Sequence, residues 1–160
     1  MNDQDSSSSF EFFKAEVRKC EKVLFELSFL TDGKSKDSSK ISDLVSTIKF
    51  LKTSCTLGNE FQSYLFENDL HLLIDGYCKY FLDKDQLVVE ECIKFYVNLT
   101  NKYETGQKEI IDRLFLKGNI GILLMSICNY KELVCVLLLN CLKFNSSLLQ
   151  LFTSSPNFIF

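Results

Sequence analysis

Apolar and polar positions follow a helical pattern along most of the chain, beginning close to its N-terminus. Over residues 10–31 apolar side chains recur every three or four positions, which is the periodicity of one helix face. Ser8 and Glu11 fit a capping box, in which a serine and a glutamate satisfy free N–H groups of the first turn. The pattern predicts an N-terminal capping helix over residues 10–31, after a flexible serine-rich tail over residues 1–9 and before a linker over residues 32–40.

The remaining residues, 41–160, carry a three-part helical pattern that recurs along the chain. The tripeptide IKF at residues 48–50 recurs at residues 93–95, and Gln62 recurs as Gln107, both about 45 residues later. A further copy begins about 42 residues after the second. Periods of about 40–47 residues are typical of armadillo and HEAT repeats, which bury their apolar faces by stacking. The sequence therefore predicts an all-α fold, a right-handed superhelix of about three armadillo/HEAT-like repeats over residues 41–160 with an N-terminal helix.

Composition and charge narrow the class of protein. The chain of 160 residues has one proline, Pro156, and six glycines, which favours long helices over many short strands. Its net charge of −3 gives no electrostatic reason to expect nucleic acid as a partner. The apolar stretch 120–142 contains Asn129, Lys131 and Glu132, so we expect two buried helices with a polar corner and no membrane span. The N-terminus lacks the basic and apolar regions of a secretory signal, and we expect a cytoplasmic protein.

The seven cysteines and the single histidine have the greatest potential for chemistry. Most of the cysteines lie among apolar neighbours and none forms a C-x-x-C pair, which is typical of reduced thiols in a cytosolic core. His71 lacks the local signature of a thiol enzyme, and one histidine with scattered cysteines does not build a tetrahedral zinc site. We therefore expect a protein that is not an enzyme and has no cofactor. The alternative is a cysteine-based redox sensor or a thiol-dependent enzyme, which one fast-reacting thiol would reveal.

A polar series occupies equivalent positions near the end of each predicted long helix. Its members are Thr53, Asn98 and Asn140. An asparagine amide donates and accepts hydrogen bonds at once, so such a series suits a groove that holds the backbone of an extended partner peptide. Alternatively, the same amides tie one repeat to the next through buried hydrogen bonds. The sequence leaves both interpretations open.

Two apolar clusters lie at the ends of the predicted stack. The N-terminal cluster comprises Phe10, Phe12, Phe13 and Phe25. It fits either a stripe that binds a partner or, more simply, a helix that covers the N-terminal face of the stack. The C-terminal cluster comprises Phe152, Phe158 and Phe160. The last repeat of a solenoid exposes its core unless it is capped, so these residues either fold back as a cap or meet a partner. We expect partner capture or self-association through this end.

The order of these segments resembles a known family of helical-repeat proteins. Residues 50–62 end a long helix at a small polar corner before a short helix with a glutamine, and residues 92–99 and 104–111 repeat the arrangement. With the long-helix pattern of residues 131–142, this order resembles the armadillo-like repeats of the ataxin-10 family, roughly over residues 41–150. The resemblance implies a cytoplasmic, non-catalytic scaffold or adaptor for other proteins, linked to cytokinesis, cilia or neuronal survival. It also implies partners such as kinases or a G-protein subunit.

Overall fold

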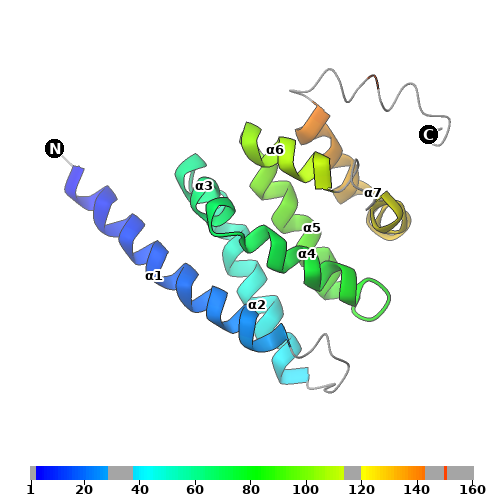
Figure 1. Cartoon of the computed structure of the whole chain (residues 1–160), viewed down its shortest axis with the longest axis horizontal. Helices are drawn as coiled ribbons and strands as arrows, with labels where there is room; N and C mark the ends of the chain where they lie inside the picture. The colour runs from blue at the N-terminus through cyan, green and yellow to red at the C-terminus, as the bar shows by residue number, and fades with distance from the viewer. Residues whose placement is uncertain (1–2, 29–37, 114–119, 143–149, 151–160) are drawn as a thin grey trace.

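The computed structural model describes residues 3–28, 38–113, 120–142 and 150 of the chain (Figure 1). Within these ranges it contains seven helices and no strand, which confirms the predicted all-α class. The helices are α1 (Asp3–Leu27), α2 (Ser38–Ser54), α3 (Asn59–Glu67), α4 (Leu70–Phe81), α5 (Gln86–Thr100), α6 (Glu104–Ile111) and α7 (Ile120–Leu142).

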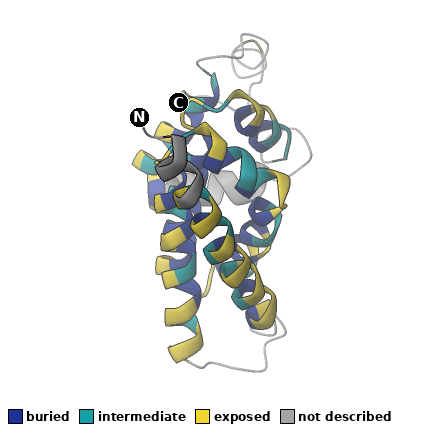
Figure 2. Ribbon diagram, turned by 90° about the vertical axis from the view of Figure 1, so that its left-hand side faces the viewer, coloured by how far each residue is buried: buried dark blue, intermediate teal, exposed yellow. Residues whose placement is uncertain are grey.

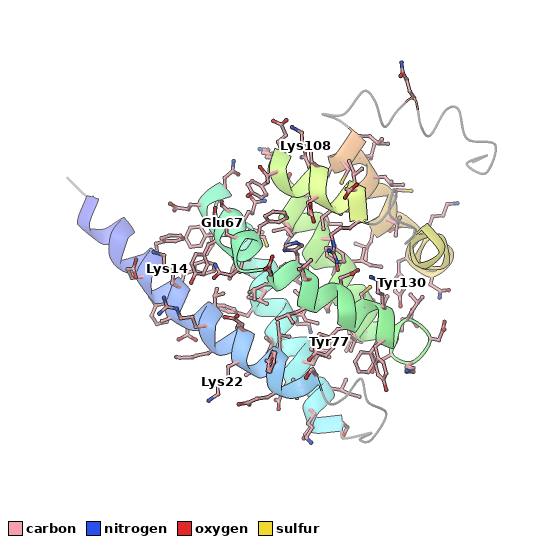
Figure 3. The ribbon with its side chains drawn as sticks, viewed as in Figure 1. Lys14, Lys22, Glu67, Tyr77, Lys108 and Tyr130 are labelled. Carbon is pink, nitrogen blue, oxygen red and sulfur yellow. The ribbon has the colours of Figure 1, made fainter. Side chains whose placement is uncertain are left out.

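Helix α5 lies at the centre of the packing. It contacts α2 on one side and α7 on the other, and it also contacts α4 and α6 (Figure 1). Helix α1 packs against α2 and α4. The Tyr77 hydroxyl of α4 donates a hydrogen bond to the carbonyl of Leu24 in α1, and Figure 3 shows Tyr77 beside that helix. The first helix therefore covers parts of α2 and α4.

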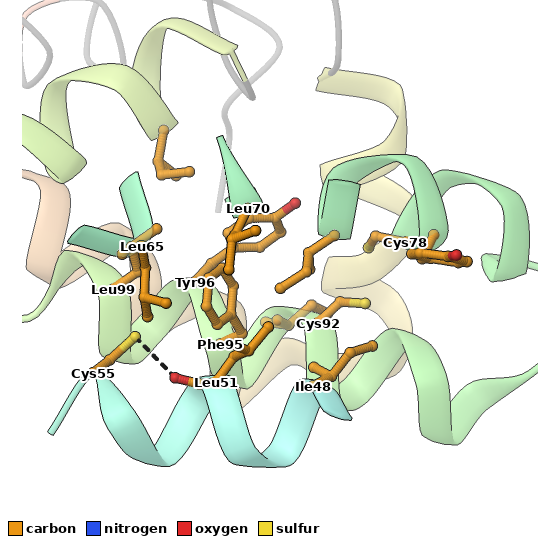
Figure 4. Close-up of a cluster of buried hydrophobic side chains, with 14 of the residues drawn as sticks. Ile48, Leu51, Cys55, Leu65, Leu70, Cys78, Cys92, Phe95, Tyr96 and Leu99 are labelled. Carbon is orange, nitrogen blue, oxygen red and sulfur yellow. Dashed lines mark hydrogen bonds between the residues drawn. The ribbon is translucent and has the colours of Figure 1, made fainter. Parts of the chain in front are cut away.

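One apolar core joins these helices. Buried positions lie on the sides of the helices that face one another, and exposed positions lie outside (Figure 2). Leu51 of α2, Leu65 of α3 and Leu70 of α4 are completely buried, and they meet Phe95 and Leu99 of α5 (Figure 4). Burying one such side chain stabilises a fold by about 1.5–3 kcal/mol. Because five side chains from four helices share this core, no helix pair alone would bury its apolar face.

The boundaries of the first two helices differ from the prediction. Helix α1 begins at Asp3, so most of the predicted flexible tail over residues 1–9 is helical, and the helix ends at Leu27 instead of residue 31. Helix α2 begins at Ser38, inside the predicted linker over residues 32–40. Serine has an intermediate helix propensity and acidic residues are favoured in a first turn, so this N-terminal segment continues a helix that tertiary contacts already stabilise.

Helix α7 consists of two helical segments joined at a break. The backbone of Tyr130 is not helical, with φ −130° and ψ 35°, and this residue lies at the polar corner that the sequence predicts. The Tyr130 hydroxyl donates to the carbonyl of Gln86 at 3.0 Å, and Nδ2 of Asn140 donates to the carbonyl of Val97 at 3.0 Å. Because these bonds join corresponding ends of the two helices, the second segment of α7 runs beside α5 in the same direction.

Candidate functional site

The three predicted groove residues differ in how they use their side chains. Nδ2 of Asn98 in α5 donates to the carbonyl of Lys52 in α2 at 3.0 Å. Nδ2 of Asn140 in α7 donates in the same way to the carbonyl of Val97 in α5, also at 3.0 Å. Thr53 is exposed, and its hydroxyl donates to a carbonyl one turn earlier in α2 at 2.9 Å. The two asparagine bonds have the geometry of ties between neighbouring long helices, the second of the two interpretations.

Two glutamines, Gln62 and Gln107, bind the C-terminal end of α5. Both side chains are 2% exposed. Nε2 of Gln62 donates to the carbonyls of Asn98 at 2.8 Å and Asn101 at 2.9 Å, and Nε2 of Gln107 donates to the carbonyl of Thr100 at 2.7 Å. A helix leaves its last four carbonyls without helical partners, so these amides supply donors to carbonyls at and just beyond the end of α5, of which that of Asn98 also accepts the backbone N–H of Asn101 at 3.3 Å. The recurrence of glutamine in the sequence was the signal for this structural role.

A row of charged side chains links α2 to α5. Nζ of Lys52 lies 2.6 Å from the carboxylate of Glu91, and Nζ of Lys94 lies 3.3 Å from the same carboxylate and 2.6 Å from that of Glu90. Burial disfavours the ionised form of Glu91, but hydrogen bonds from Lys52 and Lys94 outweigh it and lower the pKa of this carboxyl. The charges of this row therefore compensate one another, and Lys52 and Lys94 are committed to internal pairs.

An open hollow of about 510 Å³ lies between α5 and α7. It is lined by Gln86, Glu90, Lys94, Asn129, Tyr130, Lys131, Glu132 and Leu133. A second hollow of about 340 Å³ shares Gln86, Asn129 and Tyr130 with the first, and continues to the turn at residues 82–85 between α4 and α5. We call the two together the α5–α7 hollow. Its volume lies within the range of about 300–1,000 Å³ that is usual for ligand pockets, and most of the residues that line it are polar or charged.

Burial controls the properties of the cysteines. It raises the pKa of the Cys20 thiol to about 11 and the pKa values of Cys55 and Cys141 to about 12. The pKa of Cys92 is also raised well above its ordinary value, by burial first and then by the neighbouring Cys78. A thiol reacts as its thiolate, so these cysteines are protonated and poorly nucleophilic at neutral pH.

His71 is a buried side chain that is 3% exposed. Its ring stacks on Phe66 with centroids 4.3 Å apart and planes at 9°, and its Nδ1 has no hydrogen-bond partner. Burial lowers the pKa of His71, and the nearby Arg113 guanidinium lowers it further. Among the described residues, no group of three or more histidine, cysteine, aspartate or glutamate side chains is arranged to hold a metal ion. The histidine therefore lies in an aromatic packing environment.

The N-terminal phenylalanines divide into packed and exposed side chains. The ring centroids of Phe10 and Phe13 lie 5.2 Å and 4.6 Å from that of Phe61 in α3. By contrast, Phe12 and Phe25 are 69% and 71% exposed. The first pair thus covers the neighbouring helices, and the second pair remains on the outer surface of α1. The predicted C-terminal cluster lies outside the described residues: Phe152, Phe158 and Phe160.

Comparison with known proteins gives no relative of this chain. No family model matches it, and neither the curated proteins nor the solved structures include a match. In the part of the chain that the structure describes, no helix is long and apolar enough to cross a membrane. The function must therefore be inferred from the chain's own residues.

Proposed function

We propose that this chain is a non-catalytic protein-interaction module, a scaffold or adaptor that presents its long helices to other proteins. The observation that supports this function is one recurring hydrogen bond. The side-chain Nδ2 of Asn98 donates to the backbone of α2. About 42 residues later, the side-chain Nδ2 of Asn140 donates in the same way to the backbone of α5. A recurring tie holds long helices side by side, as in armadillo-like arrays such as those of the ataxin-10 family, whose extended surfaces bind proteins. We propose a cytoplasmic location on the same resemblance.

The partner surface in this proposal consists of exposed or half-buried side chains from α2, α5 and α7, and we call it the long-helix face. It includes Lys49 and Thr53 from α2, the half-buried pair Glu90 and Lys94 from α5, whose charges face each other, and Val136 from α7. The surface combines charges of both signs with an aliphatic side chain that is 43% exposed. Such mixtures of polar and apolar groups are usual in protein–protein interfaces that are not permanent.

The thiol-based alternative has less support. The pKa values of about 12 for Cys55 and Cys141 leave almost no thiolate at neutral pH. Alkylation of the native protein is expected to modify these two cysteines only as fast as the protein opens. A cysteine that reacts in the native protein at the rate of a free thiol would instead favour the redox or enzymatic function.

Site-specific photo-crosslinking tests the proposed function. A benzophenone amino acid replaces Lys49 or Val136 on the long-helix face and, as matched controls, the exposed Glu21 of α1 or Glu60 of α3. We expect one partner protein to be crosslinked in cell extract from the first two positions and not from the controls. Equal crosslinking from all four positions, or none from the long-helix face, would contradict the proposal.

A further inference from the structure

The α5–α7 hollow contains amide side chains that the fold does not use. Within the part of the chain that the structure describes, the side chains of Gln86 and Asn129 make no hydrogen bond, and both residues are exposed. In this they differ from Asn98 and Asn140, whose amide nitrogens bind neighbouring helices. A primary amide supplies both a donor and an acceptor, which are the two groups that an extended peptide presents along its backbone.

The floor of the hollow between these two amides is held in place. The hydroxyl of Tyr130 donates to the main-chain carbonyl of Gln86 at 3.0 Å, so α7 is fixed to the first turn of α5. Because this bond uses the backbone of Gln86, the side-chain amide stays available for a ligand. Lys131 and Glu132 extend the lining on the α7 side, and neither makes an ion pair among the described residues. The hollow is therefore a fixed polar surface with unused hydrogen-bonding groups.

The end of the hollow nearest the α4–α5 turn is acidic. Asp83 is exposed there without an ion pair among the described residues, and Asp85 accepts a hydrogen bond from the backbone of α5 at 3.1 Å. The one cation of this turn, Lys84, lies over the ring of Tyr80, with its Nζ 3.3 Å from the ring centroid. Burial raises the pKa of Tyr130, and the negative charges of Glu90 and Asp85 add to this effect. Two carboxylates and one ammonium group thus line this end, and a positively charged ligand is favoured over a negatively charged one.

We propose that the α5–α7 hollow binds an extended segment of a partner protein, with Gln86 and Asn129 hydrogen-bonded to its main chain and a lysine or arginine side chain beside Asp83. This inference rests on the proposed interaction function. It assigns the partner contact to the α5–α7 hollow, which shares Glu90 and Lys94 with the long-helix face. It also moves the peptide contact away from Thr53, Asn98 and Asn140, at the other end of the helices.

Two synthetic peptides provide a direct test by NMR. Each is an acetylated and amidated peptide of about nine glycine, serine and alanine residues, a length sufficient for extended recognition, with a central arginine in one and a central glutamate in the other. We expect the arginine peptide to shift the amide resonances of Gln86, Asn129 and Lys131 of the whole chain at millimolar concentration. The glutamate peptide should bind at least about threefold more weakly, because its charge is repelled at the acidic end.

Variants of exposed residues then identify the contacts. Gln86→Ala with Asn129→Ala should weaken binding of the arginine peptide about tenfold, as expected for two lost hydrogen bonds, with the melting temperature unchanged. Asp83→Asn should weaken it about threefold and abolish the preference for arginine over glutamate. Thr105→Ala, exposed on α6 and outside both the long-helix face and the hollow, is the matched control and should bind like the unaltered chain.

Three results would overturn the inference. They are the absence of shifts at these residues with either peptide, equal binding of the two peptides, and unchanged binding by the double alanine variant. The crosslinking experiment separates this inference from the proposed function. If Lys49 and Val136 crosslink a partner in the unaltered chain but neither peptide shifts the resonances of Gln86 and Asn129, the interaction function stands and only the assignment of the hollow is wrong.

Discussion

Replacement of Gln62 by leucine is the sharpest test of the ties between helices. Nε2 of Gln62 faces the carbonyls of Asn98, Leu99 and Asn101 at 2.8 Å, 3.3 Å and 2.9 Å. An amide nitrogen carries two hydrogens, so it bonds at most two of these acceptors at full strength. Each buried acceptor that loses its partner costs about 1–3 kcal/mol. The carbonyls of Asn98 and Asn101 are only partly buried, and that of Asn98 keeps its bond from the backbone N–H of Asn101 at 3.3 Å. Water and this remaining bond compensate in part, so we expect a loss of about 2 kcal/mol in the free energy of unfolding.

Gln107→Leu is the matched control for this substitution. Gln107 occupies the equivalent position, but its Nε2 makes one bond, to the carbonyl of Thr100 at 2.7 Å, and its Oε1 is buried without a partner. Leucine removes that unbonded acceptor together with the bond, so the two effects offset each other to within about 1 kcal/mol. Urea unfolding followed by far-ultraviolet circular dichroism measures both changes, since the chain has no tryptophan. A loss below about 1 kcal/mol for Gln62→Leu, or a larger loss for Gln107→Leu, would refute this reasoning.

Three further predictions concern other elements of the fold. Gly106→Ala should lower the free energy of unfolding by about 1–3 kcal/mol, because a Cβ there would lie 2.7 Å from Cδ1 of Tyr103. Gly76→Ala, whose Cβ meets nothing within 4 Å, is its control and should stabilise α4 by up to about 1 kcal/mol in the same urea assay. The pKa of His71 is lowered from 6.5 in the folded chain, so the unfolded chain takes up a proton at this residue more readily as the pH falls. The corresponding contribution to the free energy of unfolding is complete above pH 6.5 and is lost as the pH falls through the lowered pKa. The chain should therefore lose more stability than His71→Phe between about pH 7.5 and about pH 5.5, and equal losses would count against this linkage. Asn98→Ala should cost about 1 kcal/mol of stability and leave binding of the arginine peptide unchanged, whereas a loss of binding at constant stability would restore the sequence-predicted groove.

The helical spacing of apolar residues predicted most of the buried positions named here. Ile48 and Leu51 in α2 and Ile93 in α5 are all buried, as the recurring tripeptide and its spacing indicate. The ends of α1 and α2 were predicted less well, because helix termini depend on capping and tertiary contacts that a periodic pattern does not include. Ser38 shows this clearly: it lies in a serine- and lysine-rich stretch typical of a linker, yet α2 begins there.

The candidate site was only partly accessible from the sequence. The pattern located Asn98 and Asn140 at equivalent positions, but the distinction between a groove and an internal tie depends on which carbonyl each amide reaches. The α5–α7 hollow was not predicted, although the polar corner around Tyr130 was. Its shape depends on the contact between that corner and the first turn of α5, which joins residues 44 positions apart.

In this chain one set of side-chain amides stabilises the fold, and a different set is available to bind a partner. An amide that binds the backbone of a neighbouring helix must break that bond before it binds a peptide, so the net gain in binding is small. Asn98, Asn140 and Gln62 are in this position, and they hold the long helices at the spacing that creates the hollow. Gln86 and Asn129 have no such bond to break within the described residues, so a peptide displaces only the water bound to these exposed amides. Residues of one chemical type thus stabilise the packing of the helices at one end of α5, and we propose that they bind a partner at the other.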